Sequence, residues 1–436
     1  PSQALVGGTL IDGTAAVPVP DAVVVLADGR IERVGRVGEF ELPDHVELID
    51  VRGKWLIPGL IDAHVHFFQS ASLYTRPDVI DLGRWWPRER EIAWLRARLP
   101  QTWARYLASG VTGVIDMAGP HWIFAERDAA AGMPWAPEIA VAGPGLAPQL
   151  NDALMEVDPP GVIVRTPQQA REQVRRLSAY RPDLLKIWYP ESLDLDLQQE
   201  LPWIRAAVDE AHAVGLPVAA HAPQRELARA MLDAGVDVLV HSVIDEPLDA
   251  DFIDGLKAGN VVYVTTLMVE EGYQEVLGMN VDLTDIERRV GDPQVIASYA
   301  HLARLFPQAR RRAVTRPGDV ALENLRRVSD AGVTVAAGSD AGNIGALHGP
   351  ALHRELELMR RAGMTPHQVL RAATLGGAQA MGRADRLGSI EPGKAADLVI
   401  LDEDPLRDIR NTQRIHRVMK DGVLYDPAVL VPGGHP

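Results

Sequence analysis

The sequence contains no cysteine. This absence excludes disulfide bonds, iron–sulfur clusters, zinc sites built from thiolates and a cysteine nucleophile. Any metal ion that the protein binds must therefore be held by nitrogen and oxygen ligands.

The sequence also lacks an excess of basic residues and long apolar runs. It has 44 Lys and Arg against 59 Asp and Glu, a formal net charge of -15 at pH 7, which argues against nucleic acid or an anionic membrane surface as a partner. No apolar run reaches the about 18 residues that cross a bilayer, and no signal-peptide pattern opens the chain. We expect a cytoplasmic protein that acts on a small molecule. Since the sequence begins at Pro1 without Met, a secretory leader removed before this point stays an open alternative.

What is present is a repeated alternation of short apolar segments and stretches with helical spacing. Segments that are apolar along their whole length are typical of parallel strands buried on both faces. Eight such units in a row favour an α/β fold of the (β/α)8 TIM-like barrel type. The predicted strands are residues 56–64, 111–117, 138–144, 183–189, 216–221, 236–241, 260–267 and 333–340.

The two ends of the chain have a different pattern. Short alternating strands separated by Gly-Gly and Asp-Gly turns fill residues 4–51, and similar segments return as KAADLVILDEDP and RVMKDGVLY. We predict a small β-sandwich domain formed by residues 1–57 and 386–436, and a barrel over 58–385. An open α/β sheet is the alternative fold; the absence of a glycine-rich nucleotide motif after the first strand weakens it.

Three connections are unusually long, at 67–90, 145–166 and 268 to about 320. Long connections after barrel strands are more often lids or binding loops than linkers. The third contains Arg310, Arg311 and Arg312, which would receive a substrate carboxylate or, alternatively, form a solvated helix face.

Polar residues stand where five of the predicted strands end, the position at which barrels keep their chemistry. They are His64, His66, Lys186, His221, His241 and Asp340. Side chains two apart on an extended segment share a face, so His64 and His66 can bind one cation. The alternatives are two histidines in a polar turn for this pair, and hydrogen-bonded core histidines for His221 and His241.

Lys186 interrupts the apolar segment LLKIWY in a chain that has only five lysines. Because a buried unpaired ammonium is costly, this amine should be deprotonated, paired or modified. We predict that it takes up carbon dioxide to become a carbamate that bridges two cations; a lysine whose ammonium group reaches the barrel rim is the alternative. Asp340, in VAAGSDAG, is either the cap of the next helix or a ligand that accepts a proton from bound water.

These residues, with PGLIDAHVH, GSDAG and LGSIEPGKAADLVILD, resemble the amidohydrolase superfamily, and within it the imidazolonepropionase-like and prolidase-like members. The resemblance covers almost the whole chain. It implies two divalent cations, with zinc the expected metal: His64 and His66 bind the more buried ion, and His221 and His241 the more exposed one. Carboxylated Lys186 would bridge the ions.

The resemblance further implies that a hydroxide between the cations attacks an amide bond while Asp340 acts as general base and acid. Trp188, Tyr189 and His348 would contact the substrate, His348 as a second catalytic residue, although Trp188 is equally explained by packing. We expect a peptide-like, N-acyl amino acid or Xaa-Pro bond.

Several alternatives stay open at this point. The same site would serve a cyclic amide or lactone hydrolase, and the same fold would serve a deaminase with one metal ion or a scaffold that has lost its chemistry. Assembly of several copies is a mild expectation.

Overall fold

The computed structural model describes residues 2–42, 44–190, 196–313 and 318–431. Each of the eight segments predicted as barrel strands contains a strand, although most of these strands are short. They are β6 (Leu60–Val65), β7 (Val111–Asp116), β8 (Glu138–Val141), β11 (Leu185–Ile187), β12 (Val218–His221), β13 (Val238–Val240), β14 (Val262–Val264) and β15 (Val335–Ala336). All pair in parallel with their neighbours.

These strands form two parallel sheets. One has the order β6-β7-β8, and the other runs β10-β9-β11-β12-β13-β14-β15, with two further strands, β9 (Gly145–Ala147) and β10 (Gly161–Ile163), at its edge. Backbone hydrogen bonds connect the sheets at both edges: Ala63 N–H donates to Ala337 O at 2.9 Å on one side, and Asp183 N–H donates to Val141 O at 2.9 Å on the other. Leu239, Val240 and Val264 on the central strands are fully buried.

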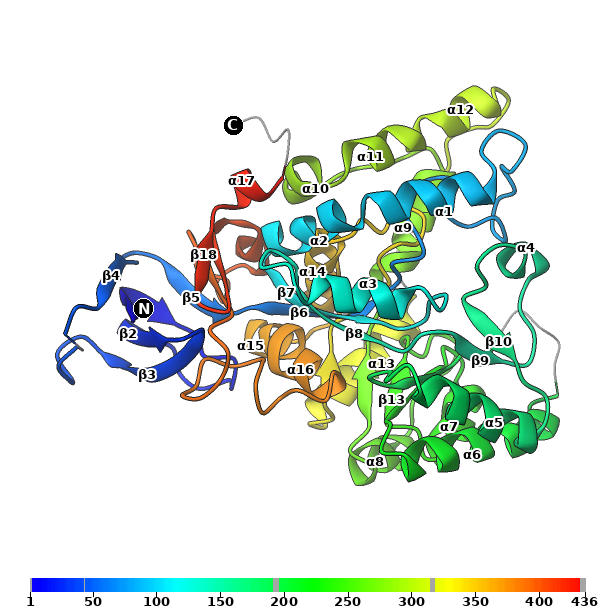
Figure 1. Cartoon of the computed structure of the whole chain (residues 1–436), viewed down its shortest axis with the longest axis horizontal. Helices are drawn as coiled ribbons and strands as arrows, with labels where there is room; N and C mark the ends of the chain where they lie inside the picture. Colours follow the sequence, from blue (N-terminus) through cyan, green and yellow to red (C-terminus); the bar gives the residue numbers. More distant parts are fainter. Residues whose placement is uncertain (1, 43, 191–195, 314–317, 432–436) are drawn as a thin grey trace.

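Helices follow the strands and cover the sheets (Figure 1). They bury their apolar residues against the strands, as expected for a parallel sheet. These helices are α1 (Arg88–Ala97), α2 (Leu99–Ala108), α3 (Ile123–Ala130), α5 (Pro167–Ser178), α6 (Leu197–Ala213), α7 (Arg225–Asp233), α8 (Ala250–Ala258), α13 (Asp319–Asp330), α14 (Ala351–Arg361), α15 (Pro366–Arg371) and α16 (Gly377–Ala380), with a π-helical turn at Ala372–Gly376 between the last two.

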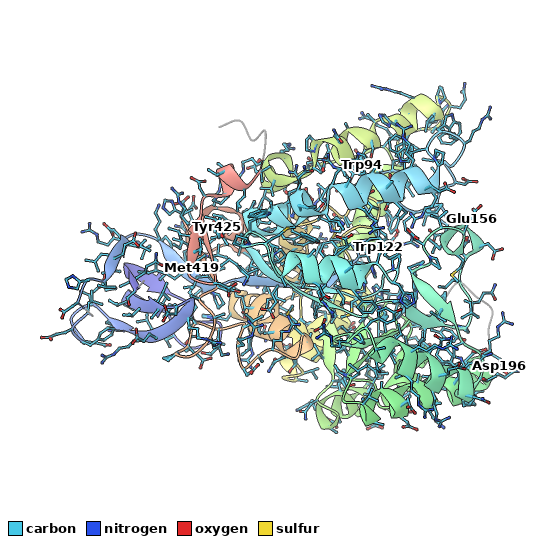
Figure 2. The ribbon with its side chains drawn as sticks, viewed as in Figure 1. Trp94, Trp122, Glu156, Asp196, Met419 and Tyr425 are labelled. Atoms are coloured by element: carbon cyan, nitrogen blue, oxygen red, sulfur yellow. The ribbon has the colours of Figure 1, made fainter. Side chains whose placement is uncertain are left out.

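Both chain ends join in one sheet beside the central strands, on the left in Figure 1. Its order is β18-β17-β16-β5-β1-β2-β3, and β4 pairs with β1. Its strands are β1 (Gln3–Leu10), β2 (Val19–Ala27), β3 (Arg30–Arg36), β4 (Glu47–Asp50), β5 (Trp55–Pro58), β16 (Leu398–Leu401), β17 (Ile415–Lys420) and β18 (Val423–Tyr425); a 3-10 turn at Ile409–Gln413 and α17 (Pro427–Leu430) complete this end of the chain. Met419 and Tyr425, labelled in Figure 2, belong to this sheet, and the Tyr425 hydroxyl donates to Pro134 O at 2.9 Å.

The first predicted strand, 56–64, is wrong as a single element. Residues up to Pro58 belong to β5 in the terminal sheet, and β6 begins at Leu60 in the central one. Pro58 has no N–H for a ladder, and a Cβ on Gly59 would lie 2.0 Å from the Thr112 hydroxyl oxygen. The chain therefore changes sheets at this Pro-Gly pair.

All three long connections contain regular structure, although 67–90 holds only the start of α1. The connection at 145–166 holds β9, β10 and α4 (Asp152–Met155), and 268–320 holds α9 (Met268–Leu277), α10 (Asp285–Val290), α11 (Pro293–Tyr299), α12 (His301–Leu305) and the start of α13. Among the described residues, no helix has the length and apolar character needed to span a membrane.

Candidate metal centre

The six predicted ligand residues lie at one end of the parallel strands and line one pocket of about 860 Å³. His64 is in β6, Lys186 in β11, and His221 ends β12. His66 and His241 follow β6 and β13 directly, and Asp340 lies four residues beyond the end of β15. Parallel strands with a common direction bring their carboxyl ends to one edge, which explains why residues far apart in sequence meet here.

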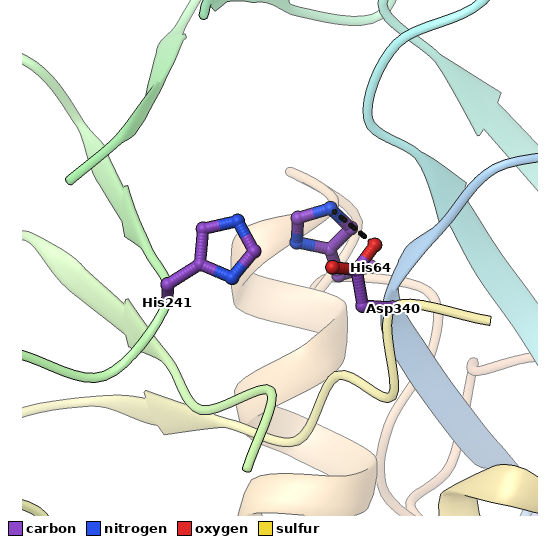
Figure 3. A group of neighbouring side chains, drawn as sticks. All are labelled: His64, His241 and Asp340. Atoms are coloured by element: carbon purple, nitrogen blue, oxygen red, sulfur yellow. Dashed lines mark ion pairs between the residues drawn. The ribbon is translucent and has the colours of Figure 1, made fainter. Parts of the chain in front are cut away.

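The donor atoms of this group lie close together. The Nε2 atoms of His64 and His66 are 3.0 Å apart, and Asp340 Oδ1 lies 3.3 Å from the first and 3.2 Å from the second. Each of His64, His241 and Asp340 offers a ligand atom, and these atoms lie within 4.8 Å of one another (Figure 3). The ring of His221 is 4.3 Å from that of His241, centroid to centroid.

The donors fit a bound cation. Four ligands at zinc-like bond lengths of about 2.1 Å are separated from one another by about 3.4 Å, close to the separations seen here. His66 Nδ1 lies 2.9 Å from Ala118 O, and because a carbonyl only accepts, Nδ1 donates and Nε2 is the ring nitrogen that faces His64 and Asp340. His64 Nδ1 and Asp340 Oδ1 are buried with no hydrogen-bond partner among the described residues. Imidazole and carboxylate suit zinc and similar ions.

Burial sets the protonation of the groups around these donors. It lowers the pKa of His64 well below the ordinary value, so the ring is neutral and able to act as a ligand. It also lowers the pKa of Lys186 to about 8, against the opposing influence of Asp340 and Asp116. Lys186 therefore has a much larger neutral fraction near neutral pH than an exposed lysine.

The backbone at this edge is strained in three places. His241 has φ 78°, Thr266 has φ 48° and Asp340 has φ 55°, in the left-handed region that non-glycine residues rarely adopt. These three residues lie beyond β13, β14 and β15, and all three line the pocket. Such strain is typical of functional sites.

The other side of the pocket holds a half-buried arginine that the sequence analysis missed. Arg76 pairs with Asp78 through Nε at 2.8 Å and Nη2 at 2.6 Å, and its Nη1 donates to the Tyr273 hydroxyl at 2.7 Å and to Asn343. Burial alone would lower the pKa of Arg76, but Tyr273 and Asp78 raise it, so the guanidinium stays charged. In the sequence, the segment TRPD at 75–78 places this arginine two residues from an aspartate in the first long connection, and that pair was the one local indication of the site.

The residues predicted to contact substrate are placed differently from one another. Trp188 lines the pocket, whereas Tyr189 is buried and is not among the lining residues. Arg310, Arg311 and Arg312 are exposed and do not line it either.

His348 lies behind the pocket lining, stacked on Phe67. Its Nε2 donates to Gln69 O at 2.7 Å and its Nδ1 accepts from the Tyr106 hydroxyl at 2.7 Å. Burial lowers its pKa to about 4, so it is neutral. Its predicted roles in catalysis and substrate binding stay predictions, and these contacts do not favour them.

Comparisons with known proteins agree with this geometry. The model of the Amidohydrolase family matches residues 55–425. The imidazolonepropionase of Cutibacterium acnes is 28% identical over 394 residues, covering 88% of this chain and 84% of the relative. A candidate prolidase from Bifidobacterium longum superposes with a TM-score of 0.73 at 25% identity, covering 97% of this chain and 94% of its own. A Xaa-Pro dipeptidase with methionine in its active site gives 0.74 at 24%, covering 98% and 100%, and at that identity the likeness concerns the fold alone.

Proposed function

The chain belongs to the amidohydrolase superfamily, to its imidazolonepropionase-like and prolidase-like subgroup, and on this premise we propose that it uses two divalent cations to hydrolyse an amide bond in a small substrate that bears a carboxylate. Family membership makes it a hydrolase of carbon–nitrogen bonds. The proposal adds the number of cations, the residues that bind them and the kind of amide. The observation that carries it is the convergence of His64, His66 and Asp340, in which His64 Nδ1 and Asp340 Oδ1 are buried without a hydrogen-bond partner among the described residues.

We assign the first cation to His64, His66 and Asp340 and the second to His221 and His241. The short distances within the first group and the close packing of the His221 and His241 rings support this division. Zinc is the expected ion because all of the donors are nitrogen or oxygen and most are imidazoles. When bound, the cations would supply an activated water molecule and polarise the scissile carbonyl.

Lys186 would join the two groups as a carbamate. Carbon dioxide reacts with a neutral amine, forming an N–C bond and releasing one proton, and the lowered pKa of Lys186 increases the fraction of amine in that form. A carbamate offers two oxygens, as a carboxylate does. The position of Lys186 in β11, next to β12 with His221 and in the same pocket as the other predicted ligands, supports this role.

Asp340 would move the proton. Its carboxylate faces His64 and His66 inside the pocket, so it can accept a proton from water and pass it to the leaving nitrogen. Its backbone N–H donates to His64 O at 2.8 Å, which fixes the turn that presents the carboxylate.

Arg76 is the group that we propose for the substrate carboxylate, in place of Arg310 to Arg312. It lines the same pocket as the metal ligands and is held by Asp78, Tyr273 and Asn343. These bonds use four of its five N–H groups in the described structure, which leaves one N–H of Nη2 for a ligand. A hydrogen bond between charged groups orients a substrate as well as binding it.

We further propose that the eight central strands close into one (β/α)8 barrel, with residues 58–385 as the barrel domain and 1–57 with 386–436 as the small β domain. The backbone hydrogen bonds between the sheets, at Ala63 on one edge and at Asp183 on the other, support closure. The pairing of β5 with both β1 and β16 supports a domain shared by the two chain ends.

The experiment is a hydrolysis screen of zinc-loaded protein with bicarbonate present. Its substrates are N-acyl amino acids and Xaa-Pro dipeptides, with cyclic amides, lactones and amino-heterocycles for comparison. We expect release of a free amino acid or proline. Turnover of lactones alone would contradict the amide assignment, and release of ammonia from amino-heterocycles alone would favour a deaminase.

A further inference from the structure

The turn that follows β14 lies between the candidate metal centre and α14. Its residue Thr266 has φ 48°, although a β-branched side chain disfavours this conformation. Its backbone N–H donates to Gly338 O at 3.0 Å, and the carbonyl of Thr265 accepts from the Ser242 backbone N–H at 3.0 Å. The turn is therefore fixed to the chain beyond β13 and beyond β15, the two strands after which His241 and Asp340 occur.

Thr266 contacts a predicted metal ligand directly. Its hydroxyl oxygen lies 2.7 Å from His241 Nδ1. When His241 binds a cation through Nε2, Nδ1 must carry the proton and donate it to an acceptor, and the Thr266 oxygen is placed to be that acceptor. The left-handed turn thus puts a hydroxyl beside Nδ1 of the ring, and Nε2 is the nitrogen that we assign to the cation.

Glu355 holds the same turn from behind. This α14 residue is fully buried, and its two carboxylate oxygens accept from the backbone N–H groups of Leu267, at 2.8 Å, and Met268, at 2.7 Å. Those N–H groups are the first two after Thr266 and stand at the start of α9, where a helix leaves its N–H groups without internal partners. Glu355 therefore caps α9 and fixes the backbone next to Thr266 in one contact.

The same cap reaches the other side of the pocket. Helix α9 carries Tyr273, whose hydroxyl accepts from Arg76 at 2.7 Å and donates to Asn343 at 2.6 Å. A shift at the start of α9 would move Tyr273 and with it the support of the guanidinium. One buried carboxylate thus connects both halves of the site.

We propose that Thr266 and Glu355 are positioning residues: Glu355 holds the strained turn, and the turn presents the Thr266 hydroxyl to His241 so that Nε2 faces the cation. This inference rests on the proposed function, because it takes His241 to be a metal ligand. Neither residue touches the reacting atoms. Both act through the orientation of His241.

The first test compares Thr266→Val with Thr266→Ser. The valine side chain keeps the β-branched shape but has no oxygen, whereas serine keeps the oxygen. We expect Thr266→Val to bind the weaker of two Zn²⁺ ions 10- to 100-fold less tightly in a chelator competition, as is usual when a metal-bound histidine loses its partner, and to change the visible spectrum of the Co²⁺ form. Thr266→Ser should restore both, and Thr266→Ala replaces the valine variant if that protein does not fold.

The second test compares Glu355→Gln with Glu357→Gln, a matched change two residues further along α14, where the side chain accepts from Gln413 instead. In metal-free protein we expect the amides of Leu267 and Met268 to exchange at least tenfold faster in Glu355→Gln. In Glu357→Gln they should exchange as in the wild type.

The inference would be overturned if Thr266→Val or Thr266→Ala kept the Zn²⁺ affinity and Co²⁺ spectrum of the wild type. Unchanged amide exchange in Glu355→Gln would overturn it as well. Either result would leave the proposed function standing. If the wild-type protein binds no cation, the proposed function itself is contradicted, and the inference falls with it.

Discussion

The buried carboxylate of Glu355 should make the stability of the protein depend on pH in a defined window. Burial raises its pKa from 4.5 to about 7, in spite of the hydrogen bonds from Leu267 and Met268 that lower it. A folded-state pKa above the unfolded value means that the folded protein binds the proton more tightly. The stability that this proton contributes is fully present below pH 4.5 and is lost as the pH rises through about 7. The difference between the folded-state and unfolded-state pKa values corresponds to about 3 kcal/mol of unfolding free energy.

The assay is urea unfolding between pH 4 and 8 in the presence of a chelator, so that release of metal does not contribute. Glu355→Gln removes the titrating group and is destabilised at low pH by its lost hydrogen bond. We expect the free energy of unfolding of the wild type to fall by about 3 kcal/mol more than that of Glu355→Gln across this window. Glu172→Gln, a change on the exposed face of α5, is the control and should follow the wild type. Parallel pH curves for the wild type and Glu355→Gln would refute the reasoning.

Three further predictions concern the site. Lys186→Ala should reduce the bound Zn²⁺, measured by elemental analysis, from two ions per chain toward one, and a short carboxylic acid should partly restore activity. Two bound ions in this variant would exclude the carbamate as the bridge between the cations. Arg76→Met is combined with Asp78→Asn so that no buried charge is left unpaired, and the double variant should raise KM about 10- to 100-fold for a substrate with a carboxylate. KM for the matching carboxamide should change little, and equal effects on both substrates would refute the assignment. His348→Ala should lower stability by about 1–3 kcal/mol through the lost bonds to Tyr106 and Gln69 and leave kcat within about threefold; a loss of kcat without a loss of stability would favour its predicted catalytic role.

The alternation of apolar segments predicted the central strands because burial on both faces leaves a clear pattern in the sequence. It also predicted that the six polar residues at the strand ends would share a pocket, as they do; their role as ligands stays a prediction. The exception was the segment 56–64. Its apolar run continues across Pro58 and Gly59, and the chain changes sheets there because β5 pairs with β1 and β16 whereas β6 pairs with β7. Those partners are distant in sequence, so no local pattern indicates the change.

Arg76 was missed for a similar reason. Its partners Tyr273 and Asn343 stand 197 and 267 residues further along the chain, so no local pattern connects them. The exposed run Arg310 to Arg312 looked like the stronger carboxylate site because sequence shows charge but not burial. The strained conformation of Thr266 has no signal either, since threonine is ordinary at the end of a strand and its φ depends on contacts from three other elements.

The central claim is tested most directly by one measurement on wild type and Asp340→Asn. Zn²⁺-loaded protein is assayed with bicarbonate for release of amino acids from N-acyl amino acids and Xaa-Pro dipeptides, with metal content determined on the same samples. We predict two Zn²⁺ per chain and amide hydrolysis in the wild type, and a loss of kcat of at least about 100-fold in a folded Asp340→Asn protein. Hydrolysis that persists unchanged in Asp340→Asn, or in metal-free wild type, would contradict the account.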